Sequence, residues 1–125
     1  MIDTKKFYNT LIKNSFDYFV GVPDSLLKEF CLCINDLSKN NHIITANEGN
    51  AVAIASGYNI ATSKYGVVYM QNSGLGNIVN PLLSLADEKV YKIHIVWRDG
   101  HCCQWLFRLF GRGARQHAGS LRSLQ

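Results

Sequence analysis

One carboxylate, Glu48, stands at a position where a catalytic or binding acid would be useful. It closely follows an apolar run, His42-Ile-Ile-Thr-Ala46, and begins a helical pattern made largely of small residues. Small side chains let another backbone or a flat ligand approach closely. A carboxylate in the first turn of a helix is also favoured by the helix dipole alone. The residues therefore leave both a catalytic and a purely structural interpretation of Glu48 open.

Two further segments contain groups that bind ligands in other proteins. Gln71-Asn-Ser-Gly-Leu-Gly-Asn77 is expected to be a glycine-bearing loop between a strand and a helix, a joint that can present backbone N–H groups to a phosphate. It matches neither GxGxxG nor a P-loop, so a plain tight turn shaped by Gly74 and Gly76 explains it as well. In the turn Val22-Pro-Asp-Ser25, Asp24 is a candidate acid catalyst or a helix cap.

The elements that must position these segments alternate between strand and helix patterns. Apolar runs predict strands at residues 17–22, 42–46, 66–70 and 90–96, and helical spacing predicts helices near residues 7–12, 27–37, 48–61 and 78–88. Short connections favour right-handed crossovers, hence a three-layer α/β fold with a mainly parallel sheet and helices on both faces, complete or truncated at its last strand. Ligands bind beyond the carboxyl ends of such strands, where all three segments lie.

Composition limits the class of protein. The chain has 125 residues, 47% of them hydrophobic, which suits one globular domain. Residues 1–91 contain seven Lys, no Arg and eight Asp or Glu, whereas residues 92–125 contain one Lys, five Arg and one Asp. This uneven charge argues against nucleic-acid binding by the whole domain. No apolar run could span a bilayer and no signal peptide is apparent, so we expect a cytoplasmic protein without membrane contact.

Four cysteines do not indicate a metal site or a disulfide. Cys31 and Cys33 lie within a helical pattern, where Cys usually packs as a small hydrophobic residue. Cys102 and Cys103 lie near two histidines, but the sequence contains no CxxC pair. We therefore expect no metal on this chain and, without a secretory signal, no disulfide.

Five separated segments occur in the order typical of one enzyme family. They are Phe19-Val-Gly-Val-Pro-Asp-Ser-Leu-Leu27, Ala46-Asn-Glu-Gly-Asn-Ala-Val52, Ala55-Ser-Gly-Tyr58, Val68-Tyr-Met-Gln-Asn-Ser-Gly-Leu-Gly-Asn77 and Asn80-Pro-Leu-Leu-Ser-Leu-Ala-Asp87. Over about residues 5–93 the sequence resembles the N-terminal pyrimidine-binding domain of thiamine-diphosphate-dependent 2-oxo-acid decarboxylases. Within that family it is most similar to phosphonopyruvate decarboxylase, and next to the sulfopyruvate decarboxylase subunit.

The resemblance implies roles for individual residues. Glu48 matches the glutamate that hydrogen-bonds the N1′ nitrogen of the cofactor's aminopyrimidine and so promotes loss of the C2 proton of the thiazolium. Asp24 matches, within one position, a candidate acid for proton transfer to the reacting substrate, and Ser25 is the alternative. The residues implied to line the cofactor pocket are Val22, Pro23, Gln71 and Asn72.

The resemblance also implies a partner. In this family thiamine diphosphate binds between this domain and a second domain, which holds the diphosphate through Mg²⁺ and carries a Gly-Asp-Gly…Asn motif. No such motif occurs here. We therefore expect half a site, with Mg²⁺ only on a diphosphate-binding partner domain or subunit, in a homo- or hetero-oligomer that decarboxylates a small 2-oxo acid, phosphonopyruvate first. The alternatives are a non-catalytic module that pairs with a full-length homologue, and a free-standing nucleotide-binding domain.

The resemblance ends near residue 93, which suggests a boundary. We interpret residues 1–93 as the pyrimidine-type domain and residues 94–125 as a divergent basic tail. Every Arg and both Trp lie in that tail, so a shifted reading frame, a joined sequence or a genuine alternative C-terminus would each explain it. Its aromatic and basic residues would suit RNA or an anionic membrane, but we favour an extension with little ordered structure.

Overall fold

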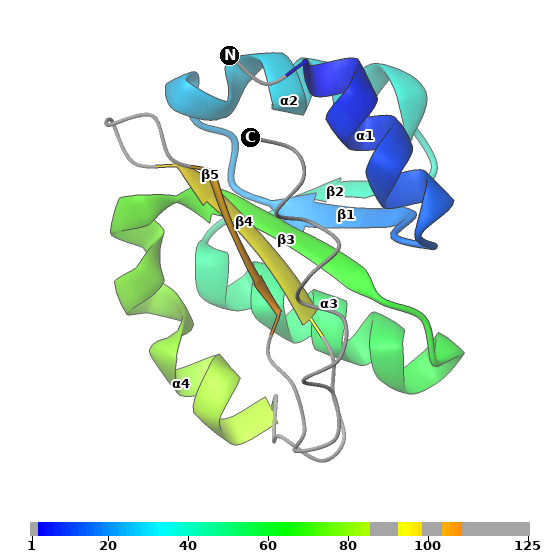
Figure 1. The fold of residues 1–125 in the computed structure, drawn as a ribbon. Helices are drawn as coiled ribbons and strands as arrows, with labels where there is room; N and C mark the ends of the chain where they lie inside the picture. Colours follow the sequence, from blue (N-terminus) through cyan, green and yellow to red (C-terminus); the bar gives the residue numbers. More distant parts are fainter. Residues whose placement is uncertain (1–2, 86–92, 99–103, 109–125) are drawn as a thin grey trace.

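The computed structural model describes residues 3–85, 93–98 and 104–108 (Figure 1). The elements are helices α1 (Thr4–Lys13), α2 (Lys28–Leu37), α3 (Glu48–Thr62) and α4 (Leu75–Leu85), strands β1 (Tyr18–Gly21), β2 (His42–Ile44), β3 (Gly66–Gln71), β4 (Ile93–Arg98) and β5 (Gln104–Arg108), and the 3₁₀ turns η1 (Ser25–Leu27) and η2 (Asn72–Gly74). No helix in these ranges has the length and apolar character needed to cross a membrane.

The sheet has the order β2-β1-β3-β4-β5. β1 pairs in parallel with both β2 and β3, β3 pairs in parallel with β4, and only β4–β5 is antiparallel. The prediction of a mainly parallel sheet is therefore confirmed. The chain runs from β1 outward to β2 and then returns past β1 to β3, which places a topological switch point between β1 and β3.

Helices cover both faces of the sheet, as predicted, with α1 and α2 on one side and α3 and α4 on the other (Figure 1). Alternate residues of β1 and β3 point to opposite faces, and each set packs into its own core. The core beneath α1 and α2 contains Tyr8, Leu11, Phe19, Leu27, Phe30, Ile34, Val67 and Tyr69. The core against α3 and α4 contains Val20, Ala51, Val52, Ala55, Val68, Met70 and Ile78.

The segment predicted as a glycine-bearing loop is helical instead. Residues 72–74 form η2 and α4 begins at Leu75, three residues before the predicted start at Ile78. No glycine in the described part of the chain has a positive φ, so Gly74 and Gly76 take helical backbone angles and do not form an open turn.

Two strands extend into the segment interpreted as a tail. β4 begins at Ile93 and runs past the boundary expected between residues 93 and 94. β5 pairs with it from His94↔Arg108 to Arg98↔Gln104, so part of the segment expected to lack ordered structure is a strand. Trp and Phe within β5 have high strand propensity. The other expectations for residues 99–103 and 109–125, and for Cys102 and Cys103, lie outside the described residues.

Candidate functional site

Three connections meet at one edge of the sheet. Because β1, β2 and β3 are parallel, the segments that follow them all leave from their carboxyl ends. These segments are residues 22–25, 45–47 and 72–77, the last two leading into α3 and α4. The structure thus brings the predicted site segments together beside the β1–β3 switch point, where ligands bind in sheets of this topology.

Glu48 is the first residue of α3. Asn47 caps this helix in an extended conformation, and its side-chain oxygen accepts a hydrogen bond from the backbone N–H of Asn50 at 2.9 Å. The half-buried Glu48 carboxylate is held through Oε2, which accepts from Nδ2 of Asn77 at 2.7 Å. Among the described residues, Oε1 has no hydrogen-bond partner. One carboxylate oxygen is therefore fixed and the other is available to a ligand.

Two glycines let the starts of α3 and α4 approach each other. A Cβ added to Gly74 would lie 2.5 Å from Cγ and 2.6 Å from Oε1 of Glu48. A Cβ on Gly49 would lie 2.9 Å from the carbonyl oxygen of Asn77 and 3.7 Å from Pro81 Cγ. We expected Gly74 only to shape a turn, but the structure also packs it against the Glu48 side chain.

The charge at this edge is negative. Glu48 lies at the start of α3 and beside the start of α4, and the positive ends of two helix dipoles favour a negative charge there. Residues 21–25, 45–50 and 71–77 contain no Lys, Arg or His. The site is therefore suited to a group that donates or shares a proton with a carboxylate. These three segments themselves offer no side-chain cation to an anion.

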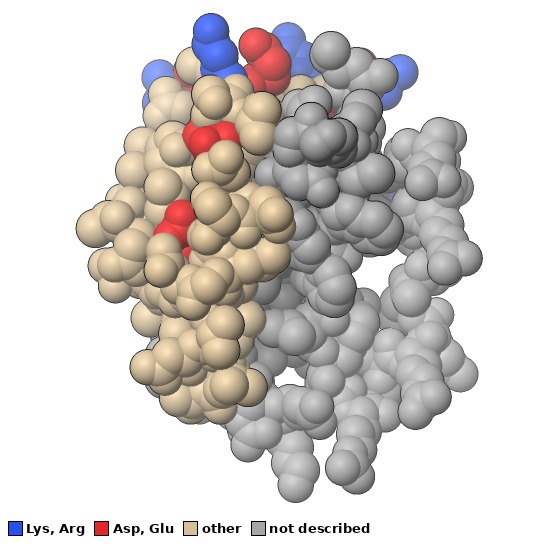
Figure 2. Space-filling model, turned by 90° about the vertical axis from the view of Figure 1, so that its left-hand side faces the viewer, with Lys and Arg blue, Asp and Glu red and all other residues tan. Residues whose placement is uncertain are grey.

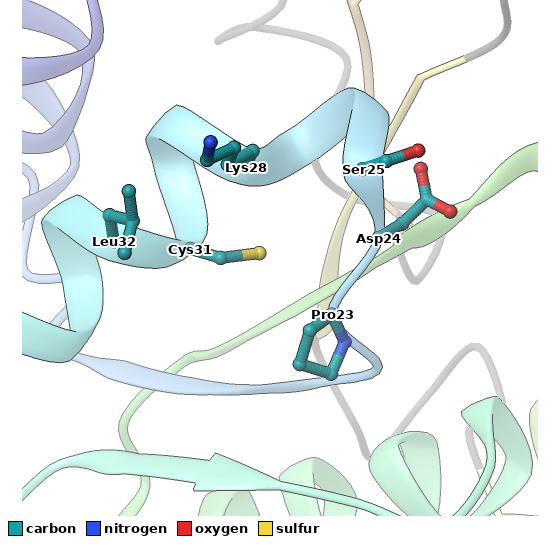
Figure 3. Close-up of a pocket in the computed structure, with 6 residues that line it drawn as sticks. All are labelled: Pro23, Asp24, Ser25, Lys28, Cys31 and Leu32. Carbon is teal, nitrogen blue, oxygen red and sulfur yellow. The ribbon is translucent and has the colours of Figure 1, made fainter.

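Asp24 has the capping role that the sequence left open. Its carboxylate Oδ1 accepts from the backbone N–H of Leu26 at 2.8 Å and so caps η1. Asp24 also lines an open depression of about 330 Å³ with Pro23, Ser25, Lys28, Cys31 and Leu32 (Figure 3). Asp24 precedes η1 and α2, which lie on one face of the sheet, whereas Glu48 begins α3 on the other face. Within the described ranges, no hydrogen bond joins the two carboxyl groups.

The remaining predicted site residues lie at the same edge of the sheet, and two of them, Val22 and Gln71, form hydrogen bonds with other residues at this edge. Val22 donates its backbone N–H to the Tyr69 carbonyl at 3.3 Å, and Gln71 Oε1 accepts from the Ser73 hydroxyl at 3.0 Å. Asn72 is exposed at the start of η2. Their contacts with a cofactor stay predictions.

Asn77, the hydrogen-bond partner of Glu48, is not among the site residues predicted from the sequence. The two residues are 29 positions apart, so no local pattern links them. The one feature of the sequence that could have indicated this contact is that a polar residue, Asn77, is the last residue of the glycine-bearing segment 71–77.

The two described cysteines lie in α2, and Cys31 lines the depression beside Asp24. Cys31 and Cys33 are half-buried against the α1–α2 core, as predicted, and burial raises the pKa of both thiols. Within residues 3–85, 93–98 and 104–108, no three His, Cys, Asp or Glu side chains gather as they would around a metal ion.

Comparison with protein families gives a match along most of the chain. The model of the thiamine pyrophosphate enzyme N-terminal TPP-binding domain matches residues 4–101. The sulfopyruvate decarboxylase subunit alpha of Methanococcus maripaludis is 34% identical over 89 residues, which are 71% of this chain and 52% of that protein. The corresponding subunit of Methanocaldococcus jannaschii is 33% identical over 78 residues, or 62% of this chain and 46% of that protein. The chain thus spans about half the length of these relatives.

Two solved structures have the same architecture. Benzoylformate decarboxylase from Polynucleobacter necessarius is 28% identical, with a TM-score of 0.55, over 66% of this chain and 16% of that chain. A thiamin diphosphate-dependent enzyme from Mycobacterium smegmatis, described as putative, is 27% identical, with a TM-score of 0.51, over 60% of this chain and 14% of that chain.

Proposed function

Because the chain belongs to the thiamine pyrophosphate enzyme family, as its N-terminal TPP-binding domain, we propose that it is the pyrimidine-binding half of a 2-oxo-acid decarboxylase. Thiamine pyrophosphate and thiamine diphosphate are the same cofactor. The decarboxylase assignment draws on relatives named as decarboxylases. In this proposal the chain is inactive without a diphosphate-binding domain or subunit of the same enzyme.

The placement of Glu48 carries this proposal. Its Oε2 is fixed by Asn77 and its Oε1 has no partner in the described part of the chain, at the sheet edge where a ligand is expected. A half-buried carboxylate in this arrangement fits a ring nitrogen that shares a proton, such as N1′ of an aminopyrimidine. Because Gly74 has no side chain, the Glu48 carboxylate has room to lie against it.

The chain's own residues would bind the pyrimidine end and handle protons. Glu48 would hold and exchange a proton at N1′, while Val22, Pro23, Gln71 and Asn72 would line the pocket around the ring. Asp24 would donate a proton to the reacting carbon after decarboxylation. Bound thiamine diphosphate supplies a cationic thiazolium that accepts the electron pair released as carbon dioxide leaves. Mg²⁺, which balances the diphosphate charge, would be bound by the partner domain or subunit.

The substrate is proposed to be a small 2-oxo acid with a second, terminal anionic group. The sequence resemblance favours phosphonopyruvate, which would yield phosphonoacetaldehyde and carbon dioxide, whereas the curated relatives are named for sulfopyruvate. The two compounds differ in the terminal group, a phosphonate or a sulfonate. Turnover of each by the reconstituted enzyme, measured as carbon dioxide release, decides between them.

The decisive variant is Glu48→Gln, which keeps a side chain able to hydrogen-bond but cannot exchange a proton in the same way. We expect turnover of the enzyme reconstituted with its diphosphate-binding subunit to fall at least about 100-fold. Glu29→Gln is the matched control, because Glu29 is an exposed acid in the first turn of α2. It should retain activity within about twofold, and circular dichroism should show both variants folded. Full activity of Glu48→Gln would contradict the proposal and favour a non-catalytic interaction module.

A further inference from the structure

The depression beside Asp24 brings a cation next to the candidate acid. Its volume of about 330 Å³ lies within the range of small-ligand pockets, about 300–1,000 Å³. The turn after β1 and the first half of α2 line it with Pro23, Asp24, Ser25, Lys28, Cys31 and Leu32 (Figure 3). Lys28 is the only Lys, Arg or His among these described lining residues. A small ligand that lies in the depression therefore meets one positive side chain.

The Lys28 ammonium group is not engaged elsewhere in the described part of the chain. It is exposed and forms no ion pair there, whereas Lys64 lies 3.9 Å from Asp17. The Asp24 carboxylate lines the same depression, but its Oδ1 accepts from the backbone N–H of Leu26 at 2.8 Å and does not pair with Lys28. The positive charge of Lys28 is therefore available to an anionic ligand.

The positive charge at this edge of the sheet belongs to the α2 layer. The described segments that follow β1, β2 and β3 contain no Lys, Arg or His, and neither do α3 and α4. In Figure 2 the basic atoms visible among the described residues lie at the top, at the level of α1 and α2 in Figure 1. Lys28 is the first residue of α2, so the helix dipole adds to its charge, and Glu29 does not line the depression. An anion is therefore favoured at Lys28 and disfavoured at Glu48.

The chemistry of the proposed substrate requires an anion close to Asp24. In the proposed reaction Asp24 donates a proton to the former keto carbon, and one methylene group separates that carbon from the terminal phosphorus or sulfur. The terminal oxyanion must therefore lie beside Asp24. An acid that is about to donate a proton is uncharged, so Asp24 in that role does not repel the oxyanion. A lysine binds phosphate-like groups as a point charge with several N–H donors.

We propose that Lys28 binds the terminal tetrahedral oxyanion, a phosphonate or a sulfonate, of the 2-oxo acid. This proposal rests on the proposed function, because that function introduces the substrate. Lys28 is then a specificity-determining residue, which favours a 2-oxo acid with a second anionic group over pyruvate, which lacks one. It contributes to binding and not to proton transfer, so its loss should change KM and leave kcat unaffected.

The first test measures binding of small oxyanions to the full chain without cofactor. Methylphosphonate and methanesulfonate are titrated into isotope-labelled protein, and the amide shifts of the turn after β1 and of the first turn of α2 give the affinities. We expect Lys28→Gln to weaken binding at least about fivefold, and Lys28→Arg, which keeps the charge, to weaken it less than about twofold. Lys6→Gln should bind like the wild type, because Lys6 is an exposed cation of α1 that does not line the depression. Binding that is equal in the wild type and Lys28→Gln, or absent from both, overturns the proposal.

The second test measures steady-state kinetics of the reconstituted enzyme on the 2-oxo acid that it decarboxylates. Lys28→Gln should raise KM at least about tenfold and change kcat less than about twofold. Lys28→Arg should restore most of the affinity, and Lys6→Gln should leave both constants unchanged. A fall in kcat at an unchanged KM would place Lys28 in the chemical step and would contradict a role in binding the terminal group.

The outcomes separate this proposal from the proposed function. If Lys28→Gln keeps the wild-type KM and oxyanion affinity while turnover still depends on Glu48, the oxyanion subsite is wrong and the function stands. If oxyanion binding depends on Lys28 but the reconstituted wild type decarboxylates neither phosphonopyruvate nor sulfopyruvate, the proposed function is wrong and the oxyanion site stands. If binding is independent of Lys28 and turnover is absent, both are overturned.

Discussion

Gly74 and the carboxylate of Glu48 are in such close contact that no side chain fits between them. A Cβ at position 74 would lie 2.5 Å from Cγ, 2.6 Å from the carboxyl carbon and 2.6 Å from Oε1 of Glu48. Real Cβ atoms almost never approach other atoms this closely, so one of the two groups would have to move. The absence of a side chain at Gly74 therefore leaves the space that the Glu48 carboxylate occupies.

Gly74→Ala should displace the Glu48 side chain and weaken its hydrogen bond to Asn77. Because Gly74 does not have a positive φ, the backbone accepts Ala and the fold should persist. We expect kcat/KM of the reconstituted enzyme to fall at least about tenfold, since small displacements of catalytic groups are costly.

Gly76→Ala is the matched control for Gly74→Ala. Its added Cβ would have no atom within 4 Å, and Ala in a helix should raise the free energy of unfolding by roughly 0.5–1 kcal/mol. Steady-state kinetics and thermal unfolding of both variants test the comparison. Equal activities would show that the Gly74 contact does not position Glu48.

Asn77→Ala should remove the one hydrogen bond that holds Glu48 Oε2. The bond is exposed, so its loss should cost about 1 kcal/mol, or roughly fivefold in kcat/KM. Asn77→Asp should be more harmful than Asn77→Ala, because it replaces the donor with a second carboxylate that repels the first. Asn80→Ala, an exposed residue of the same helix, is the kinetic control. Activity of Asn77→Asp above that of Asn77→Ala would argue against a positioning role for this amide.

The candidate acid was predictable from sequence because its signals are local. An apolar strand precedes it, Asn47 provides a cap, and the apolar positions that follow have helical spacing, so the start of α3 is specified within a few residues. The continuous apolar runs of β1 and β3 are equally local, and they predict strands that are buried on both faces of the sheet.

The environment of Glu48 was not predictable in this way. Its contact with Asn77 depends on how α3 packs on α4, which is set by Gly49 against the Asn77 carbonyl and Pro81. Glycines at positions 74 and 76 normally suggest an open loop, but here Gly74 serves close packing within a helical turn. The antiparallel pairing of β5 with β4 likewise depends on tertiary structure, and no short sequence pattern predicts it.

His42 should make the fold less stable in mild acid. Its Nε2 lies 2.8 Å from the hydroxyl of the buried Tyr69, and desolvation lowers the pKa of His42. The folded protein therefore binds this proton less tightly than the unfolded chain. The free energy of unfolding should fall as the pH falls through the unfolded value of about 6.5.

His42→Gln removes this titration and keeps a side chain able to hydrogen-bond. The decrease in unfolding free energy between about pH 7.5 and about pH 5.5 should therefore be smaller in His42→Gln than in the wild type. Urea denaturation at several pH values measures both decreases. Identical pH profiles would show that His42 titrates alike in the folded and unfolded chains.

Asp24→Asn separates the capping role of Asp24 from its proposed role in proton transfer. Asn caps helical turns about as well as Asp, so the acceptor for the Leu26 N–H should remain and stability should change by less than about 0.5 kcal/mol. Asn cannot deliver a proton, so we expect kcat to fall at least about tenfold. Asp24→Ala should additionally lose about 1 kcal/mol of unfolding free energy with the cap. Ser25→Ala tests the alternative assignment. A loss of kcat there, together with full activity of Asp24→Asn, would move the proton-transfer role to Ser25 and leave Asp24 as a cap.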